Sequence, residues 1–132
     1  MEAPKLYRKE RILLADDHED TLMALRAALE AEGHEVQSAS DGMEVLRRFA
    51  AFRPTVLILD LNMPKLDGFD VCSVIRSRSA DRTLRIVALS GHVLPEDRER
   101  SRRAGFDEHL AKPLDFALLR EALSGLPAAR VP

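Results

Sequence analysis

The chain has 132 residues, of which 45% are hydrophobic and 32% are charged, and its 20 basic residues nearly balance its 22 acidic ones. This length suits one compact domain, so we expect no attached output domain. A formal net charge of -2 argues against a general binder of nucleic acid or anionic membrane, which would carry a basic excess. We therefore expect no direct nucleic-acid binding and no membrane contact.

Cysteine usage and the N-terminus indicate a cytoplasmic protein. Cys72 is the only cysteine, so the chain can form neither an internal disulfide nor a thiolate metal site. The N-terminal segment has an apolar run of four residues before two aspartates, which is too short for a signal peptide or a membrane span. We expect a reducing, cytoplasmic setting, with residues 1–9 as an extension ahead of the domain.

The first elements in chain order are a strand and a helix. Residues 12–15 form a short apolar run that predicts a strand. Leucines then recur at helical spacing until Gly33, a residue that favours helix C-termini; they are Leu22, Leu25 and Leu29. This pattern predicts an amphipathic helix that ends near Gly33.

A weaker strand and a second helix follow. Residues 36–39 predict the strand. Asp41 with Glu44 three residues later resembles a capping box that opens a helix. We expect this helix to end at Arg53-Pro54 and to bury Val45, Leu46 and Phe49.

The middle of the chain predicts the centre of a sheet. Residues 55–59 (TVLIL) are apolar without alternation, which is typical of a parallel strand covered on both faces. A loop over 62–68 leads to a third helix marked by Val71, Cys72 and Ile75, and residues 86–89 predict a fourth buried strand.

The C-terminal part completes five strand-helix units. Pro95 suits the first turn of a fourth helix that ends near Gly105, and this helix has so few apolar residues that we expect it to be the least firmly packed. A short strand near 109–111 precedes a last helix that uses Leu118, Leu119, Ala122, Leu123 and Leu126. The alternation predicts an α/β domain over residues 10–126, with helices on both faces of a parallel sheet and residues 127–132 as a tail.

At the C-terminal ends of four of the five predicted strands stand polar residues that can take part in catalysis or metal binding. Asp16 and Asp17 follow the first strand, Asp60 the third, Ser90 the fourth and Lys112 the fifth. In open α/β sheets, ligands bind just outside the carboxyl ends of the strands. We therefore expect these five side chains to converge on one site.

Each of these residues also has a purely structural interpretation. Asp16 or Asp17 could cap the following helix, and Ser90 could be an ordinary turn hydroxyl. Asp60 is harder to explain in this way, because a carboxylate after four apolar strand residues is costly unless it is paired or metal-bound. Lys112 stands out in a chain with 16 arginines and 4 lysines, and a compact ammonium suits a single phosphate oxygen.

The residue types at this edge predict phosphoryl chemistry. Three carboxylates in one cleft repel one another unless a hard cation lies among them, and Mg²⁺ binds carboxylates together with phosphate oxygens. One carboxylate can then attack phosphorus and form an aspartyl-phosphate. The metal, the lysine and the serine hydroxyl would stabilise charge on the transferring phosphoryl group.

At these positions the sequence resembles the receiver domains of bacterial two-component response regulators, of which the chemotaxis response regulator is a small, single-domain form. The matching segments are ILLADD at 12–17, LILDLNMPKLDG at 57–68, ALSG at 88–91 and AGFDEHLAKPLD at 104–115. The resemblance covers about residues 10–126. It implies a flavodoxin-like, doubly wound fold with five parallel strands in the order 2-1-3-4-5.

The resemblance also implies roles for the strand-end residues. Asp60 would be the phosphoacceptor and would take phosphate from the histidine of a sensor histidine kinase or a phosphotransfer protein. Asp16 and Asp17 would hold Mg²⁺ together with Asp60, and the backbone carbonyl of Asn62 would be a further ligand. Ser90 would form a hydrogen bond with the phosphoryl group.

Further consequences concern the switch. Lys112 would pair with a phosphate oxygen next to a cis bond to Pro113, and a downstream protein target would bind the fourth helix, fifth strand and fifth helix. His109 stands where such domains usually carry a Tyr or Phe that swings inward. A histidine there could make the switch sensitive to pH, and a partly exposed histidine without such a role is the alternative. The other histidines lie on different segments without metal-ligand spacing: His18, His34 and His92.

Several functions compete for this sequence. We expect a phosphorylation-driven signalling switch rather than a conventional enzyme. A phosphatase with a strand-end aspartate nucleophile is the second hypothesis, but Asn62 stands where that class commonly carries its general acid. A receiver module of a hybrid histidine kinase and a binding module that works without phosphorylation are further alternatives. A dinucleotide-binding domain is excluded, because no glycine-rich loop follows the first strand.

Overall fold

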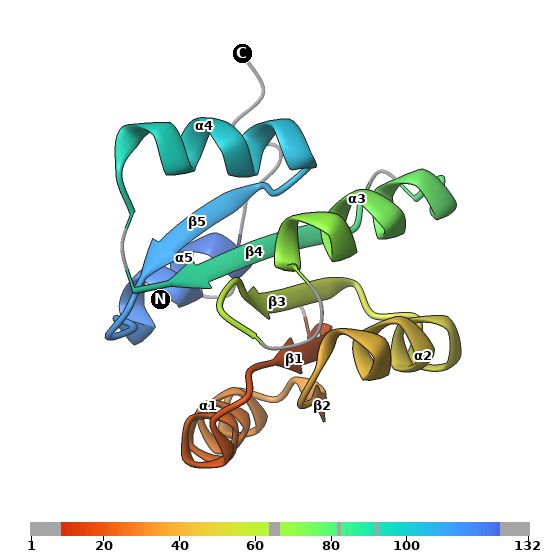
Figure 1. Cartoon of the computed structure of the whole chain (residues 1–132). Coiled ribbons are helices and arrows are strands. Elements are labelled where there is room, and N and C mark those ends of the chain that lie inside the picture. Colours follow the sequence, from red (N-terminus) through yellow and green to blue (C-terminus); the bar gives the residue numbers. More distant parts are fainter. Residues whose placement is uncertain (1–8, 64–66, 82, 92, 125–132) are drawn as a thin grey trace.

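Five parallel strands alternate with five helices in the computed structural model, which describes residues 9–63, 67–81, 83–91 and 93–124 (Figure 1). The strand order β2-β1-β3-β4-β5 confirms the predicted doubly wound α/β fold. Leu126, His92 and the predicted tail lie outside the described residues. The elements are β1 Arg11–Ala15, α1 Glu19–Ala31, β2 Glu35–Ala39, α2 Gly42–Phe52, β3 Val56–Asp60, α3 Gly68–Arg78, β4 Arg85–Ser90, α4 Pro95–Ala104, β5 Glu108–Ala111 and α5 Phe116–Ser124.

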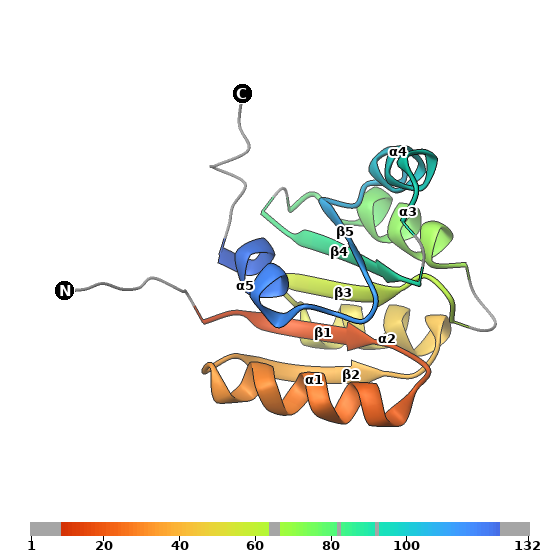
Figure 2. The ribbon, with the colours of Figure 1, turned by 90° about the vertical axis from the view of Figure 1, so that its left-hand side faces the viewer.

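Alternate strand residues face opposite sides of the sheet and build two separate cores. On one face, Leu57 and Leu59 pack with apolar residues of α2 and α3. On the other face, Val56 and Ile58 pack with apolar residues of α1 and α5. Figure 2 shows β3 in the middle of the sheet, and every residue of this strand is buried, as the unbroken apolar run predicted.

The end of α2 follows the sequence prediction more closely than its beginning does. The Asp41 side chain accepts a hydrogen bond from the Glu44 amide, as in a capping box. The Glu44 carboxylate, however, accepts from the backbone amide and hydroxyl of Ser40 rather than from the amide of Asp41. At the other end, Arg53 adopts a left-handed conformation with φ of 55° immediately before Pro54.

One predicted core position of the last helix is wrong. Leu119 and Leu123 are buried, but Leu118 is 49% exposed. Successive helical residues point about 100° apart, so Leu118 turns away from the sheet when Leu119 faces it. Among the described helices, none is long and apolar enough to cross a membrane.

Candidate functional site

The parallel register brings the strand ends to one edge of the sheet. Ala15 pairs with Leu59, so the residues that follow them, Asp16 and Asp60, leave their strands side by side. Ser90 pairs with Ala111 at the neighbouring strand ends, and its carbonyl accepts a 2.8 Å hydrogen bond from the amide of the next residue, Lys112. The expected convergence of these segments is thus present in the fold.

The aspartates of this edge form a tight acidic cluster. Asp16 and Asp60 are fully buried, whereas the Asp17 side chain is 30% exposed. One ligand atom from each of Asp16, Asp17, His18 and Asp60 can be chosen so that all four atoms lie within 4.8 Å of one another. Buried carboxylates at this spacing require a cation, because neither solvent nor the apolar core offsets their charge.

Both carboxylate oxygens of Asp60 have a partner. Oδ1 accepts a 2.9 Å hydrogen bond from the amide of Asn62, and Oδ2 accepts a 3.0 Å hydrogen bond from Nζ of Lys112. The same ammonium lies 3.4 Å from Oδ2 of Asp16. Burial lowers the pKa of Lys112, but the hydrogen bond and charge of Asp60, helped by Asp16, outweigh it and hold this pKa above its ordinary value. The peptide bond between Lys112 and Pro113 is cis.

The residues present fit a divalent cation. Three carboxylates carry three negative charges, and Lys112 returns one positive charge, which leaves two negative charges to offset. Oδ2 of Asp16 is buried and accepts no hydrogen bond from any described residue. A hard, oxygen-binding dication such as Mg²⁺ matches this donor set. The backbone carbonyl of Asn62 stays a predicted further ligand.

Ser90 and His109 form a buried pair beside the cluster. Ser90 Oγ lies 2.8 Å from Nε2 of His109, and the two residues are only 7% and 4% exposed. The alternative of a partly exposed His109 is therefore wrong, because α4 covers this face of β5. Burial, together with the charge of Arg98 on α4, lowers the pKa of His109, although Asp97 opposes the shift.

His18 joins this cluster, although the spacing of the histidines in the sequence did not predict that. Its Nδ1 lies 3.2 Å from Oδ1 of Asp16 and 3.2 Å from Oδ1 of Asp17, so the expectation that His18 lacks metal-ligand spacing is wrong. His18 is the N-cap residue of α1, yet its side chain makes no capping hydrogen bond. Its position immediately after two aspartates at a strand end was the available clue.

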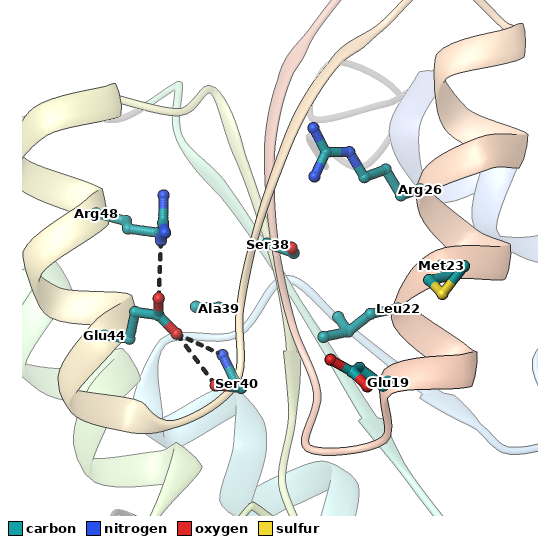
Figure 3. Close-up of a pocket in the computed structure, with 9 residues that line it drawn as sticks. All are labelled: Glu19, Leu22, Met23, Arg26, Ser38, Ala39, Ser40, Glu44 and Arg48. Atoms are coloured by element: carbon teal, nitrogen blue, oxygen red, sulfur yellow. Dashed lines mark hydrogen bonds and ion pairs between the residues drawn. The ribbon is translucent and has the colours of Figure 1, made fainter.

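Two other features of the described residues, a surface hollow and a cysteine, do not offer a second reactive site. Figure 3 shows a hollow between α1 and α2 in which the Glu44 carboxylate is hydrogen-bonded to Ser40 and Arg48, and no residue of the acidic cluster lines it. Cys72 is fully buried in the core, and this burial raises the pKa of its thiol to about 12. A thiol with such a pKa does not supply a thiolate nucleophile at neutral pH.

Comparison with known proteins places this geometry in one family. A family model described as "Response regulator receiver domain" matches residues 12–124. "Transcriptional regulatory protein PrrA" of Mycobacterium leprae is 38% identical over 109 residues, which are 83% of this chain and 46% of that protein. The chain thus spans less than half the length of this relative.

Two solved structures extend the comparison. The chemotaxis response regulator CheY4 of Vibrio cholerae has a TM-score of 0.78 and 28% identity, covering 86% of this chain and 98% of that one. The receiver domain of the response regulator Ssk1 in a co-crystal with the Saccharomyces cerevisiae histidine phosphotransfer protein Ypd1 has a TM-score of 0.82. At 21% identity, with 90% of this chain and 89% of the other covered, this second likeness shows the shared fold alone.

Proposed function

Since this chain belongs to the response regulator receiver domain family of two-component signalling, we propose that it is a switch driven by phosphorylation of Asp60. The observation that carries the proposal is the buried Asp60 carboxylate in the acidic cluster, with the Lys112 ammonium 3.0 Å away. Members of this family are signalling modules rather than conventional enzymes. The proposed reaction therefore modifies the protein itself and not a separate substrate.

The proposed reaction is an in-line displacement at phosphorus. A carboxylate oxygen of Asp60 forms the new P–O bond while the bond from phosphorus to the donor breaks, and the donor nitrogen or oxygen leaves with its electron pair. Lys112 would pair with a phosphoryl oxygen, and the Ser90 hydroxyl would donate a hydrogen bond to another. Asp16, Asp17 and Asp60 would hold Mg²⁺, which would supply positive charge near the transferring group.

The partners proposed are those of the family. A sensor histidine kinase or a phosphotransfer protein would donate the phosphoryl group, and the complex of Ypd1 with the Ssk1 receiver domain is an example of such a pairing. A downstream protein target would bind through α4, β5 and α5, beside the Ser90–His109 pair. In a larger protein, including a hybrid histidine kinase, the same face would act on an attached domain.

Labelling with acetyl phosphate tests the proposal. With Mg²⁺ present, the chain should gain one acid-stable, alkali-labile acyl phosphate, measured by intact-protein mass spectrometry. Asp60→Ala should abolish the gain, and removal of Mg²⁺ with a chelator should suppress it. Asp20→Asn, which removes an exposed carboxylate on the first turn of α1, should label like the unaltered chain.

Three outcomes would reject this function. Unchanged labelling of Asp60→Ala would show that another residue is the acceptor. Sustained turnover of phosphomonoesters by the unaltered chain would favour the phosphatase hypothesis. Undiminished binding of the downstream target by Asp60→Ala would favour a module that works without phosphorylation.

A further inference from the structure

His18 adds an imidazole to the acidic cluster. Its Nδ1 lies 3.2 Å from a carboxylate oxygen of Asp16 and 3.2 Å from one of Asp17, while its side chain is 69% exposed. N-cap side chains usually bond to an amide of the first helical turn, but the His18 ring does not. The ring nitrogen is therefore directed to the carboxylates rather than used to start the helix.

The spacing of these atoms suits ligands of a single octahedral ion. Adjacent ligands with bonds of about 2.1 Å lie about 3.0 Å apart, and opposite ligands about 4.2 Å apart. The two nitrogen–oxygen distances of 3.2 Å are close to the first value, and one ligand atom from each of the four residues can be chosen so that all lie within 4.8 Å of one another. Oδ2 of Asp16 is buried, and its one contact with a charged group among the described residues is the Lys112 ammonium 3.4 Å away.

We propose that His18 is a nitrogen ligand of this metal site and makes it prefer late first-row divalent ions, such as Co²⁺, Ni²⁺ and Zn²⁺, over Mg²⁺. The proposal rests on the function proposed above, because it uses the same carboxylates. Imidazole favours these ions, whereas Mg²⁺ selects oxygen ligands and keeps its waters. When a cation binds Nδ1, the proton of the neutral ring is on Nε2.

Such a ligand would set which metal fills the site. If all the ligands were oxygen atoms, the site would distinguish Mg²⁺ from the late metals only through its carboxylates. All of these ions bind carboxylates. One added nitrogen raises the affinity for the late metals selectively, since a ligand suited to them is gained while the charge of the site stays the same. His18 is thus a specificity-determining residue for the metal and not for the phosphoryl group.

The test compares three proteins at one neutral pH: the unaltered chain, His18→Asn and Asp17→Asn. Asparagine is a strong N-cap residue, so His18→Asn removes the ring without weakening the start of α1. Co²⁺ titrations followed by proton NMR should show a strongly shifted, solvent-exchangeable imidazole N–H resonance in the unaltered chain and none in His18→Asn. By calorimetry, His18→Asn should lose about tenfold in Co²⁺ affinity and less than about twofold in Mg²⁺ affinity. Asp17→Asn should lose affinity for both.

The outcomes separate the two proposals. A Co²⁺ complex without a shifted imidazole resonance, or one in which the resonance persists in His18→Asn, would overturn the role of His18. Equal losses of Co²⁺ and Mg²⁺ affinity in His18→Asn would do the same, because they would indicate a general distortion of the site. Failure of Asp60 labelling with Mg²⁺ in the unaltered chain would instead contradict the proposed function.

Discussion

Lys112 places one ammonium between two fully buried carboxylates, 3.0 Å from Asp60 and 3.4 Å from Asp16. We predict that Lys112→Met lowers the free energy of unfolding in the absence of metal. The loss should be about 1–2 kcal/mol, less than the ~3–5 kcal/mol of a fully buried pair, because the Lys112 side chain is 27% exposed. Urea denaturation measures it, with Lys9→Met as a control for the loss of an exposed lysine.

Added Mg²⁺ sharpens this prediction. A dication can replace the positive charge that Lys112→Met removes, so millimolar Mg²⁺ should restore part of the lost stability. Equal stability of Lys112→Met and the unaltered chain without metal would show that the carboxylates do not depend on this ammonium.

The lowered pKa of His109 predicts that the stability of the fold depends on pH. Burial and Arg98 lower its pKa in the folded state, so below about pH 6.5 the unfolded chain takes up a proton that the folded chain does not. Stability is therefore fully present above that pH and decreases as the pH falls. His34, whose pKa is lowered by burial against the opposing charges of Glu10 and Glu32, acts with the same sign.

The contribution of His109 can be separated by substitution. Between about pH 7.5 and about pH 5.5, the free energy of unfolding should fall less in His109→Phe than in the unaltered chain. His34→Gln should remove the contribution of His34 to this decrease. The double variant should show the smallest change in the free energy of unfolding with pH. Parallel profiles for His109→Phe and the unaltered chain would contradict this account.

At the scale of elements, α4 is held differently from its neighbours. Ser101 is its only buried residue, whereas α1 buries three leucines. Arg100 connects α4 to the start of α3: its guanidinium lies 4.0 Å from the centre of the Phe69 ring and 3.6 Å from the Asp67 carboxylate. As expected, α4 buries little apolar surface, and a contact made by a charged side chain connects it to α3.

This contact predicts how α4 opens. Arg100→Ala should speed hydrogen exchange of the α4 amides by about two- to fivefold, which corresponds to the ~0.5–1 kcal/mol of an exposed cation–π contact. Arg103→Ala is the matched control, because Arg103 lies on the same helix and pairs with Glu99 of that helix. Equal exchange rates in both variants would contradict a special role for Arg100.

At the scale of the whole molecule, the acidic cluster joins the end of β3 to the segment after β1, and Lys112 adds the segment after β5. A dication bound there stabilises the fold by mass action, about 1.4 kcal/mol when Mg²⁺ is about tenfold above its dissociation constant. We predict a higher Tm with Mg²⁺ than with Na⁺ at equal ionic strength, and a much smaller difference in Asp17→Asn. An undiminished Mg²⁺ effect in Asp17→Asn would place the ion elsewhere.

The sequence by itself determined the order of the helices and strands and the positions of the candidate site residues at the strand ends. The unbroken apolar run of β3 and the leucine spacing of α1 are local patterns, and both elements formed as predicted. Asp16, Asp60, Ser90 and Lys112 could be assigned to one edge because parallel strands place their carboxyl ends together. Family resemblance then supplied the strand order.

Only the tertiary structure decided which side chains touch and which are buried. Ser90 and His109 are 19 residues apart in sequence, and Lys112 and Asp60 are 52 apart, so no local pattern describes their contacts. Burial of His109 depends on where α4 packs, and the direction of the His18 ring depends on the path from β1 into α1. Periodicity shows which face a residue occupies within its own element, whereas contact and burial arise from the packing of elements that are distant in the chain.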